Sequence, residues 1–219
     1  MILSDAELHA CQDSPPFQGG AGGGANPPPS PQFITIVSGL PRSGTSMMMN
    51  ILAAGGMNIL TDNARIPDED NPRGYYELEK VKALKDGENE WLSEAQGKAV
   101  KIISALLHHL PSQYQYKIIF MRRDLDEILA SQNQMLVRRD EPTDKIDDYT
   151  LGGLFQKHLT QVEKWLSEQP NIGVTYVNYN DILQNPERDI QKVVQFLDLS
   201  LDKCLMLGVP EKNLYRQRG

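Results

Sequence analysis

The sequence predicts an α/β fold of the P-loop type: a three-layer sandwich in which helices flank a central parallel sheet. Three observations support this prediction. Short apolar runs rich in β-branched residues alternate with longer segments of helical character, which is typical of parallel sheets. The first apolar run ends in a glycine-rich turn that leads into a helix, as in phosphate-binding loops. The chain has 219 residues, enough for one sizeable core.

Four short runs are predicted to be strands, because each is apolar and bounded by glycine or polar residues. They are FITIVS (33–38), KAVKII (98–103), YKIIFM (116–121) and GVTYVNY (173–179).

Five longer segments are predicted to be helices. One has acids in its first turn and arginines in its last, which matches the helix dipole. Another can use Asn185 as N-cap with Pro186 at its first helical position. The five segments are 45–54, 76–85, 124–139, 152–169 and 185–199.

The chain is predicted to consist of a disordered leader, residues 1–32, and one folded domain, residues 33–219. Glycine and proline dominate the leader, so no apolar surface offsets the entropy of ordering it. The first residues lack the basic and apolar regions of a signal peptide, and no apolar run approaches transmembrane length. Cys11 and Cys204 lie far apart. We therefore expect no structural disulfide, no membrane and a cytoplasmic location.

The net charge of -7 argues against nucleic acid or an anionic membrane as a partner, because both would repel the chain. Positive charge is instead expected at a small anionic site, although scattered surface arginines would give the same count. Six arginines fall in or beside motif-like stretches: Arg42, Arg73, Arg122, Arg123, Arg216 and Arg218.

The stretch SGLPRSGTSMMMN has the spacing of a P-loop. Gly39 and Gly44 lie five residues apart and Ser46 supplies the final hydroxyl, but Thr45 stands where G-x-x-x-x-G-K-[ST] has lysine. Free amides at the start of the following helix favour an anion. The cation is instead Arg42, whose planar fork suits two oxygens of one group. This change indicates a ligand less charged than a triphosphate, and one that needs no metal.

A second anion site is predicted after the strand 116–121. Arg123 follows its carboxyl end, where ligands bind in open α/β sheets. Ser131 lies about two turns into the next helix, in an apolar stripe with Ile128 and Met135. A serine in such a stripe needs a hydrogen-bond partner. It could find one on a ligand or within its own helix.

These residues resemble a family. PRSGTS resembles the 5′-phosphosulfate loop of sulfotransferases that use 3′-phosphoadenosine 5′-phosphosulfate (PAPS), and Arg123 and Ser131 match the pair that grips the 3′-phosphate there. VNYNDILQNP resembles the family segment Y-x-D-[LMI]-x-x-x-P, which implies that Tyr179 lies near the adenine. DNPRGYYE and the terminal LYRQRG also resemble short bacterial members.

The sequence departs from the family at three positions. The family often has proline and aspartate where this chain has Leu125 and Glu127. Cytosolic members stack a tryptophan on the adenine where this chain has Met47.

The resemblance implies transfer of a sulfuryl group from PAPS to a hydroxyl or amine, without a metal. The acceptor, a small molecule or a peptide, and the oligomeric state are not implied. Arg42 would stabilise charge on the leaving phosphate oxygen. The implied PAPS-binding residues are Arg42, Ser43, Gly44, Thr45, Ser46, Arg123, Ser131 and Tyr179.

Glu77 is the favoured general base, because NPRGYYE combines a turn, two aromatics and a carboxylate. An ordinary acid in the first turn of a helix is the alternative interpretation. The family's base histidine would fall at Ile103 or Ser104. The other candidates for the base are Asp68, Glu69, His108 and His109.

Two further points stay open. Arg216 and Arg218 would either reach the 3′-phosphate or belong to a frayed tail. The competing functions are a P-loop phosphotransferase, in which Asp124 would hold Mg²⁺, and a non-catalytic nucleotide-binding module.

Overall fold

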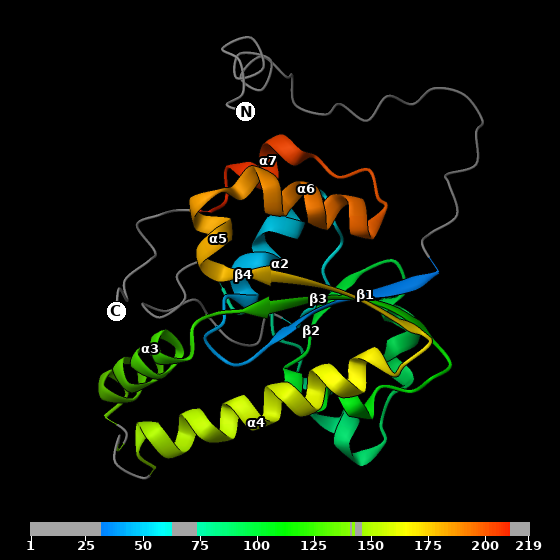
Figure 1. Cartoon of the computed structure of the whole chain (residues 1–219). Helices are drawn as coiled ribbons and strands as arrows, with labels where there is room; N and C mark the ends of the chain where they lie inside the picture. The colour runs from blue at the N-terminus through cyan, green and yellow to red at the C-terminus, as the bar shows by residue number, and fades with distance from the viewer. Residues whose placement is uncertain (1–31, 63–73, 141, 143–145, 211–219) are drawn as a thin grey trace, which may run out of the picture. The chain divides into compact units, whose positions relative to one another are not determined.

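The structure is a computed structural model that describes residues 32–62, 74–140, 142 and 146–210. Its four strands form one parallel sheet in the order β2-β1-β3-β4 (Figure 1). All four predicted strands are therefore confirmed. The strands are β1 (Phe33–Gly39), β2 (Ala99–Lys101), β3 (Gln115–Arg122) and β4 (Ile172–Asn178).

Helices cover both faces of this sheet, which confirms the three-layer α/β prediction (Figure 1). One face carries α2 (Thr45–Ala54), α5 (Tyr179–Gln184), α6 (Pro186–Leu197) and α7 (Lys203–Leu207). The other carries α4 (Asp148–Ser167) and three 3₁₀ helices, η1 (Glu79–Asp86), η2 (Glu90–Ala95) and η3 (Ser104–His109).

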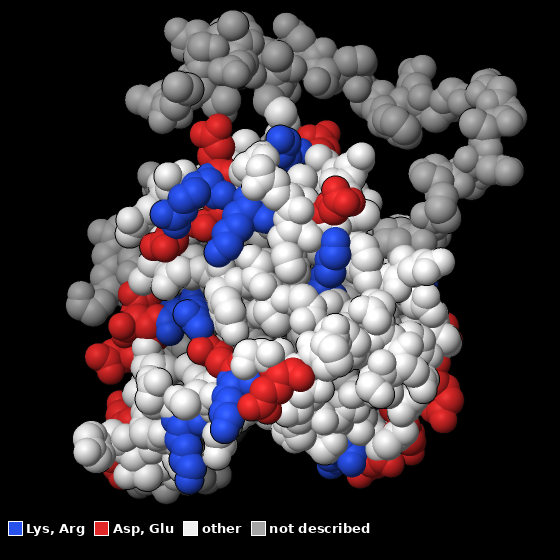
Figure 2. Space-filling view, turned by 45° about the vertical axis from the view of Figure 1, so that its right-hand side comes forward, with Lys and Arg blue, Asp and Glu red and all other residues white. Residues whose placement is uncertain are grey.

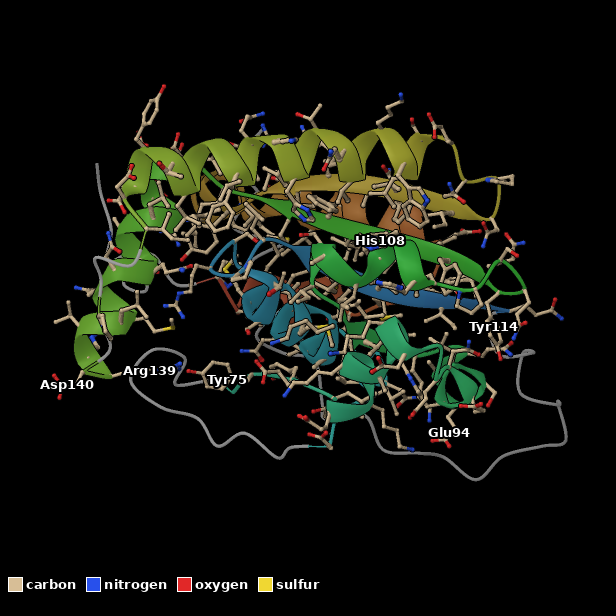
Figure 3. The ribbon with its side chains drawn as sticks, turned by 90° about the horizontal axis from the view of Figure 1, so that it is seen from below. Tyr75, Glu94, His108, Tyr114, Arg139 and Asp140 are labelled. Atoms are coloured by element: carbon tan, nitrogen blue, oxygen red, sulfur yellow. The ribbon has the colours of Figure 1, made fainter. Side chains whose placement is uncertain are left out.

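β3 and the helix that follows it, α3 (Leu125–Arg138), together run from one side of the domain to the other. Arg139 and Asp140, just after α3, lie on the opposite side of the view from Tyr114, just before β3 (Figure 3). The N-terminus of α3 is therefore near the sheet and its C-terminus projects away from it.

Side chains of the central strands alternate between the two faces, as a strand's period of two requires. Ile34 and Ile36 pack toward α4 and the 3₁₀ helices, whereas Val37 packs toward α2 and α6. Met48 and Met49 on α2 are fully buried against the same face as Val37. These methionines pack the core.

Two predicted helices have different bounds. The segment predicted as a helix over 76–85 has no regular structure up to Leu78 and then forms η1. Val81 and Leu84 are its buried residues, and their three-residue spacing places them on one face of a 3₁₀ helix, which has three residues per turn. The helix predicted from Gly152 begins four residues earlier, because Asp147 caps it by accepting the Thr150 amide.

The surface charges are mixed. Positive and negative side chains lie beside one another on the face shown in Figure 2. Among the described ion pairs, Arg122 lies 2.7 Å from Glu163 and Arg188 lies 3.1 Å from Asp181. The charges of these two exposed arginines are thus neutralised by their neighbours.

Cys204 in α7 is disulfide-bonded, which contradicts the expectation that the chain has no structural disulfide. Cys11 and nearly all of the predicted leader lie outside the described residues. The cysteines therefore no longer support the argument for a reducing compartment. Within the described ranges, no helix combines the length and apolar character needed to cross a bilayer.

Candidate active site

The candidate site lies where the strands end. Because β1, β3 and β4 are parallel, their carboxyl ends meet at one edge of the sheet. The loop before α2 follows β1, α3 follows β3, and α5 follows β4. Three segments that are distant in sequence thus converge at the position where open α/β sheets bind ligands.

The loop after β1 is shaped by its own hydrogen bonds. Both the amide and the Oγ hydroxyl of Ser43 donate to the Leu40 carbonyl, at 3.2 and 2.7 Å. Ser43 is buried, and both of these donors close the turn on Leu40. Thr45 and Ser46 lie in the first turn of α2, where backbone N–H groups have no partner within the helix.

Position 44 requires glycine for two reasons, its backbone conformation and the lack of space for a side chain. Its φ of 95° lies in the left-handed region, and a Cβ atom there would come within 2.4 Å of Cδ2 of Tyr179. The start of α2 therefore packs directly on the Tyr179 ring. Burial raises the pKa of the Tyr179 phenol, so the hydroxyl keeps its proton. Tyr179 begins α5 and is not the last strand residue, because Asn178 caps the helix.

The two predicted anion sites are joined by direct contacts. Arg42 Nε donates to Ser131 Oγ at 3.0 Å, and Arg123 Nη1 donates to the Arg42 carbonyl at 3.1 Å. Ser131 is buried and has its partner on Arg42, not within its own helix. The structure therefore brings together Arg42, Arg123 and Ser131, as the sequence had suggested for residues that share one ligand.

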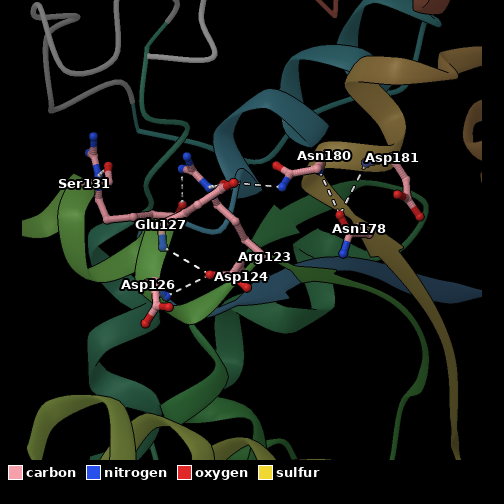
Figure 4. A network of polar contacts seen from close by, with 9 residues as sticks. Arg123, Asp124, Asp126, Glu127, Ser131, Asn178, Asn180 and Asp181 are labelled. Atoms are coloured by element: carbon pink, nitrogen blue, oxygen red, sulfur yellow. Dashed lines mark hydrogen bonds and ion pairs between the residues drawn. The ribbon is translucent and has the colours of Figure 1, made fainter. Parts of the chain in front are cut away.

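Arg123 is held on three sides. Its Nε donates to Glu127 Oε2 at 2.9 Å, and its guanidinium lies 4.4 Å from the centre of the Tyr179 ring. Asn180 Nδ2 donates to the other Glu127 oxygen at 3.0 Å (Figure 4). The arginine side chain is thus fixed by residues of α3 and α5 before any ligand binds.

These residues fit a ligand with two separate phosphate groups. The backbone amides at the start of α2 suit the first group. Arg123 and Ser131 supply donors for a second group about two helical turns along α3. PAPS, with a 5′-phosphosulfate and a 3′-phosphate, has this chemistry. Met47 is partly buried and packs on the core.

Glu77 lies in a different environment. Its Oε1 is 3.5 Å from Nζ of Lys101, at the carboxyl end of β2, and its side chain is 43% exposed. Lys101 is only 9% exposed and also donates to the Tyr75 carbonyl. The predicted base is therefore ion-paired, and the nearest aromatic, Tyr75, has its ring 5.9 Å from the same lysine.

The histidines lie on η3 and α4. Ser104 Oγ and His158 Nε2 are 2.9 Å apart, and the rings of His108 and His109 are 4.3 Å apart. Burial lowers the pKa of His158 and of His108, and nearby His108 lowers that of His158 further. His158 and His108 are therefore neutral near pH 7 and could accept protons.

The neighbours of Arg123 have structural roles. Arg122 forms two contacts with Glu163 on α4 and lies 4.0 Å from the Tyr176 ring centre. Asp124 is the N-cap of α3, accepting from the Asp126 and Glu127 amides. Arg122 and Asp124 line a cavity of about 390 Å³ together with residues of α4. Asp124 thus has a role that does not require Mg²⁺.

Several predicted residues lie outside the described residues. They are Asp68, Glu69, Arg73, Arg216 and Arg218.

Four residues of the site were missed in the sequence. Glu127 lies four residues after Arg123 on one helix, a spacing that favours ion pairs, so a signal was present. Lys101 lies within the predicted strand 98–103 and ends the observed strand β2, which pairs with β1. Asn180 and His158 gave no signal, because their contacts span 53 and 54 residues.

The family model for the sulfotransferase domain matches residues 34–214. A search of curated protein sequences found no match. A mouse sulfotransferase, SULT7A1, solved in complex with PAP, superposes with a TM-score of 0.52 at 16% identity over 81% of this chain and 62% of its own. At that identity the likeness shows the fold alone.

Two other structures superpose less well. A sulfotransferase domain from the Synechococcus PCC 7002 olefin synthase gives a TM-score of 0.49 at 16% identity, over 86% of this chain and 84% of its own. A sugar kinase from Janibacter sp. HTCC2649 gives 0.41 at 13% identity, over 83% and 99%. The family match spans most of the chain, so this protein belongs to the sulfotransferase domain family, whose members use PAPS.

Proposed function

We propose that the chain binds PAPS at the edge formed by β1, β3 and β4 and transfers its sulfuryl group to a hydroxyl or amine of a small molecule or peptide. The single observation that carries this proposal is the contact chain from Ser131 through Arg42 to Arg123. It joins the 5′-loop to the residues expected at the 3′-phosphate, and a simple 5′-nucleotide site has no use for such a link.

Each residue of the loop has a role in this proposal. The amides of Gly44, Thr45 and Ser46 hold the 5′-phosphate, and the Thr45 and Ser46 hydroxyls add donors. Arg42 stabilises the negative charge that builds on the departing phosphate oxygen, which is the largest single contribution expected in such a reaction. Ser43 acts indirectly, because it keeps the turn closed on Leu40.

Arg123 and Ser131 bind the 3′-phosphate, and Tyr179 forms the wall between the two groups. Tyr179 is buried between Gly44 and Arg123, which suits a residue that contacts the nucleoside.

Glu77 takes the acceptor's proton. Its half-exposed carboxylate can be reached by an acceptor, and Lys101 holds it in place from β2. His108 and His109 are the described alternatives for this role.

Calorimetry tests the donor. We expect the wild-type chain to bind 3′,5′-adenosine bisphosphate (PAP), the product left by PAPS, in the absence of metal. Binding of Mg²⁺-ATP without binding of PAP would overturn the proposal in favour of a phosphotransferase. A screen with labelled PAPS against cell extracts then identifies the acceptor, and failure with every extract would favour a non-catalytic nucleotide-binding module.

Arg123→Ala and Ser131→Ala should each weaken PAP binding, by about tenfold or more, while binding of adenosine 5′-phosphate changes little. Arg122→Ala is the matched control, because this neighbour is paired with Glu163, and it should leave PAP affinity nearly unchanged. Equal losses for both ligands would exclude the 3′-site assignment.

A further inference from the structure

We propose that Glu127 and Asn180 are positioning residues that fix the Arg123 side chain for the 3′-phosphate. This inference rests on the proposed function. It adds that affinity for the 3′-phosphate depends on a contact between α3 and α5 that touches no ligand.

The Arg123–Glu127 pair is buried. Their side chains are only 7% and 10% exposed. Taking two charges out of water is costly unless the remaining lone pairs and protons are also satisfied. Asn180 meets this need, because its Nδ2 donates to Glu127 Oε1 while Arg123 Nε donates to Oε2. Both carboxylate oxygens of Glu127 are thereby held in place. Because the carboxylate is fixed, it restrains the Arg123 side chain that donates to it.

The orientation of Asn180 supports this role. Its Oδ1 atom is buried and has no hydrogen-bond partner in the described part of the chain. An unpaired buried oxygen is unfavourable, but turning the amide over would place it against the Glu127 carboxylate. The amide therefore keeps an orientation that satisfies Glu127 at the expense of its own oxygen (Figure 4).

The other end of Arg123 restrains the loop. Its Nη1 donates to the carbonyl of Arg42, a residue with φ of 68°, in the left-handed region that disfavours non-glycine residues. Nε and Nη1 are engaged in this way, and no described residue accepts a hydrogen bond from Nη2. Nη2 can therefore serve a phosphate oxygen while the other two nitrogens keep the loop and α3 in register.

The test is calorimetry of PAP and adenosine 5′-phosphate with Asn180→Ala and Asn180→Asp. Asn180→Ala should lower the affinity for PAP about tenfold and the affinity for adenosine 5′-phosphate less than about twofold. Asn133→Ala is the matched control, because Asn133 lies on α3 and, among the described residues, its side chain bonds to exposed Asp148. It should leave both affinities unchanged, and thermal melting confirms that each variant is folded.

Asn180→Asp adds a readout that a purely structural role would not give. It places a second carboxylate against Glu127, and two carboxylates at that distance share a proton. Raising the pH from about 5.5 to 8 ionises both and pushes Glu127 out of position. PAP affinity relative to wild type should then fall with rising pH for Asn180→Asp but stay flat for Asn180→Ala.

The outcomes separate the two claims. If wild type does not bind PAP, the proposed function and this inference both fail. If wild type binds PAP but Asn180→Ala lowers the affinities for PAP and adenosine 5′-phosphate equally, or lowers neither, only the positioning role is overturned. A flat pH profile for Asn180→Asp would likewise overturn it.

Discussion

The donor end and the acceptor end of the site are built differently. At the donor end, the Arg123 side chain is 7% exposed and is contacted by the loop, by α3 and by α5. At the proposed acceptor end, Glu77 is 43% exposed and pairs with Lys101. A phosphate-binding arginine is thus fixed in advance, whereas the proposed base stays open to solvent.

This difference has a physical reason. A guanidinium keeps its charge when buried, and pre-orienting it avoids an ordering cost each time a nucleotide binds. A general base must instead reach substrates and exchange protons, which requires access. Burial is therefore concentrated at the proposed co-substrate site, and exposure at the proposed acceptor site.

The largest effect is expected at Arg42. Arg42→Ala should lower the rate of sulfuryl transfer by about 10²–10³-fold, because a fixed cation at a developing negative charge is removed. PAP affinity should fall much less. Transfer of label to the acceptor found by screening is the measurement, and near-normal turnover would rule out the role.

Glu77 tests the acceptor end. Glu77→Gln should reduce transfer about a hundredfold and leave PAP affinity unchanged, because glutamine keeps the size of the side chain but accepts no proton. Glu79→Gln is the control, since Glu79 is 70% exposed and pairs only with Lys82 among the described ion pairs. An unchanged rate for Glu77→Gln would show that another residue acts as the general base.

Gly44 tests the packing of the donor end. Gly44→Ala adds left-handed strain and a clash with Tyr179, so we expect unfolding free energy to fall by about 2–4 kcal/mol. Gly56→Ala is the matched control: its φ is 89° and a Cβ there meets nothing within 4 Å. It should cost only the strain, about 1–2 kcal/mol. Equal losses in urea unfolding would show that the ring contact contributes nothing.

The smallest effect is expected at His158, and it concerns pH. Burial lowers the pKa of His158 in the folded state, so the unfolded chain binds its proton first as the pH falls. The contribution of His158 to the free energy of unfolding is therefore complete above the ordinary histidine pKa. It decreases as the pH falls from about 7 to 5. His158→Gln should flatten that slope in urea unfolding, and an unaltered slope would show that His158 is protonated in the folded chain.

Local patterns were enough to predict most elements. The alternation of apolar residues marked all four strands, and caps such as Asn185, which accepts the Arg188 amide, marked helix starts. Errors arose where short segments had weak patterns: η1 was predicted as an α-helix, while η2, η3, α5 and α7 were not expected. In each of these, packing on the sheet decides the conformation.

The sequence by itself determined the family, the glycine-rich loop and the arginine–serine pair, because each depends on residue types at short, fixed spacings. Only the tertiary structure decided that Arg42 contacts Ser131, that Asn180 holds Glu127, and that Glu77 pairs with Lys101. These contacts join residues 89, 53 and 24 positions apart, because the parallel sheet brings the carboxyl ends of distant strands to one edge.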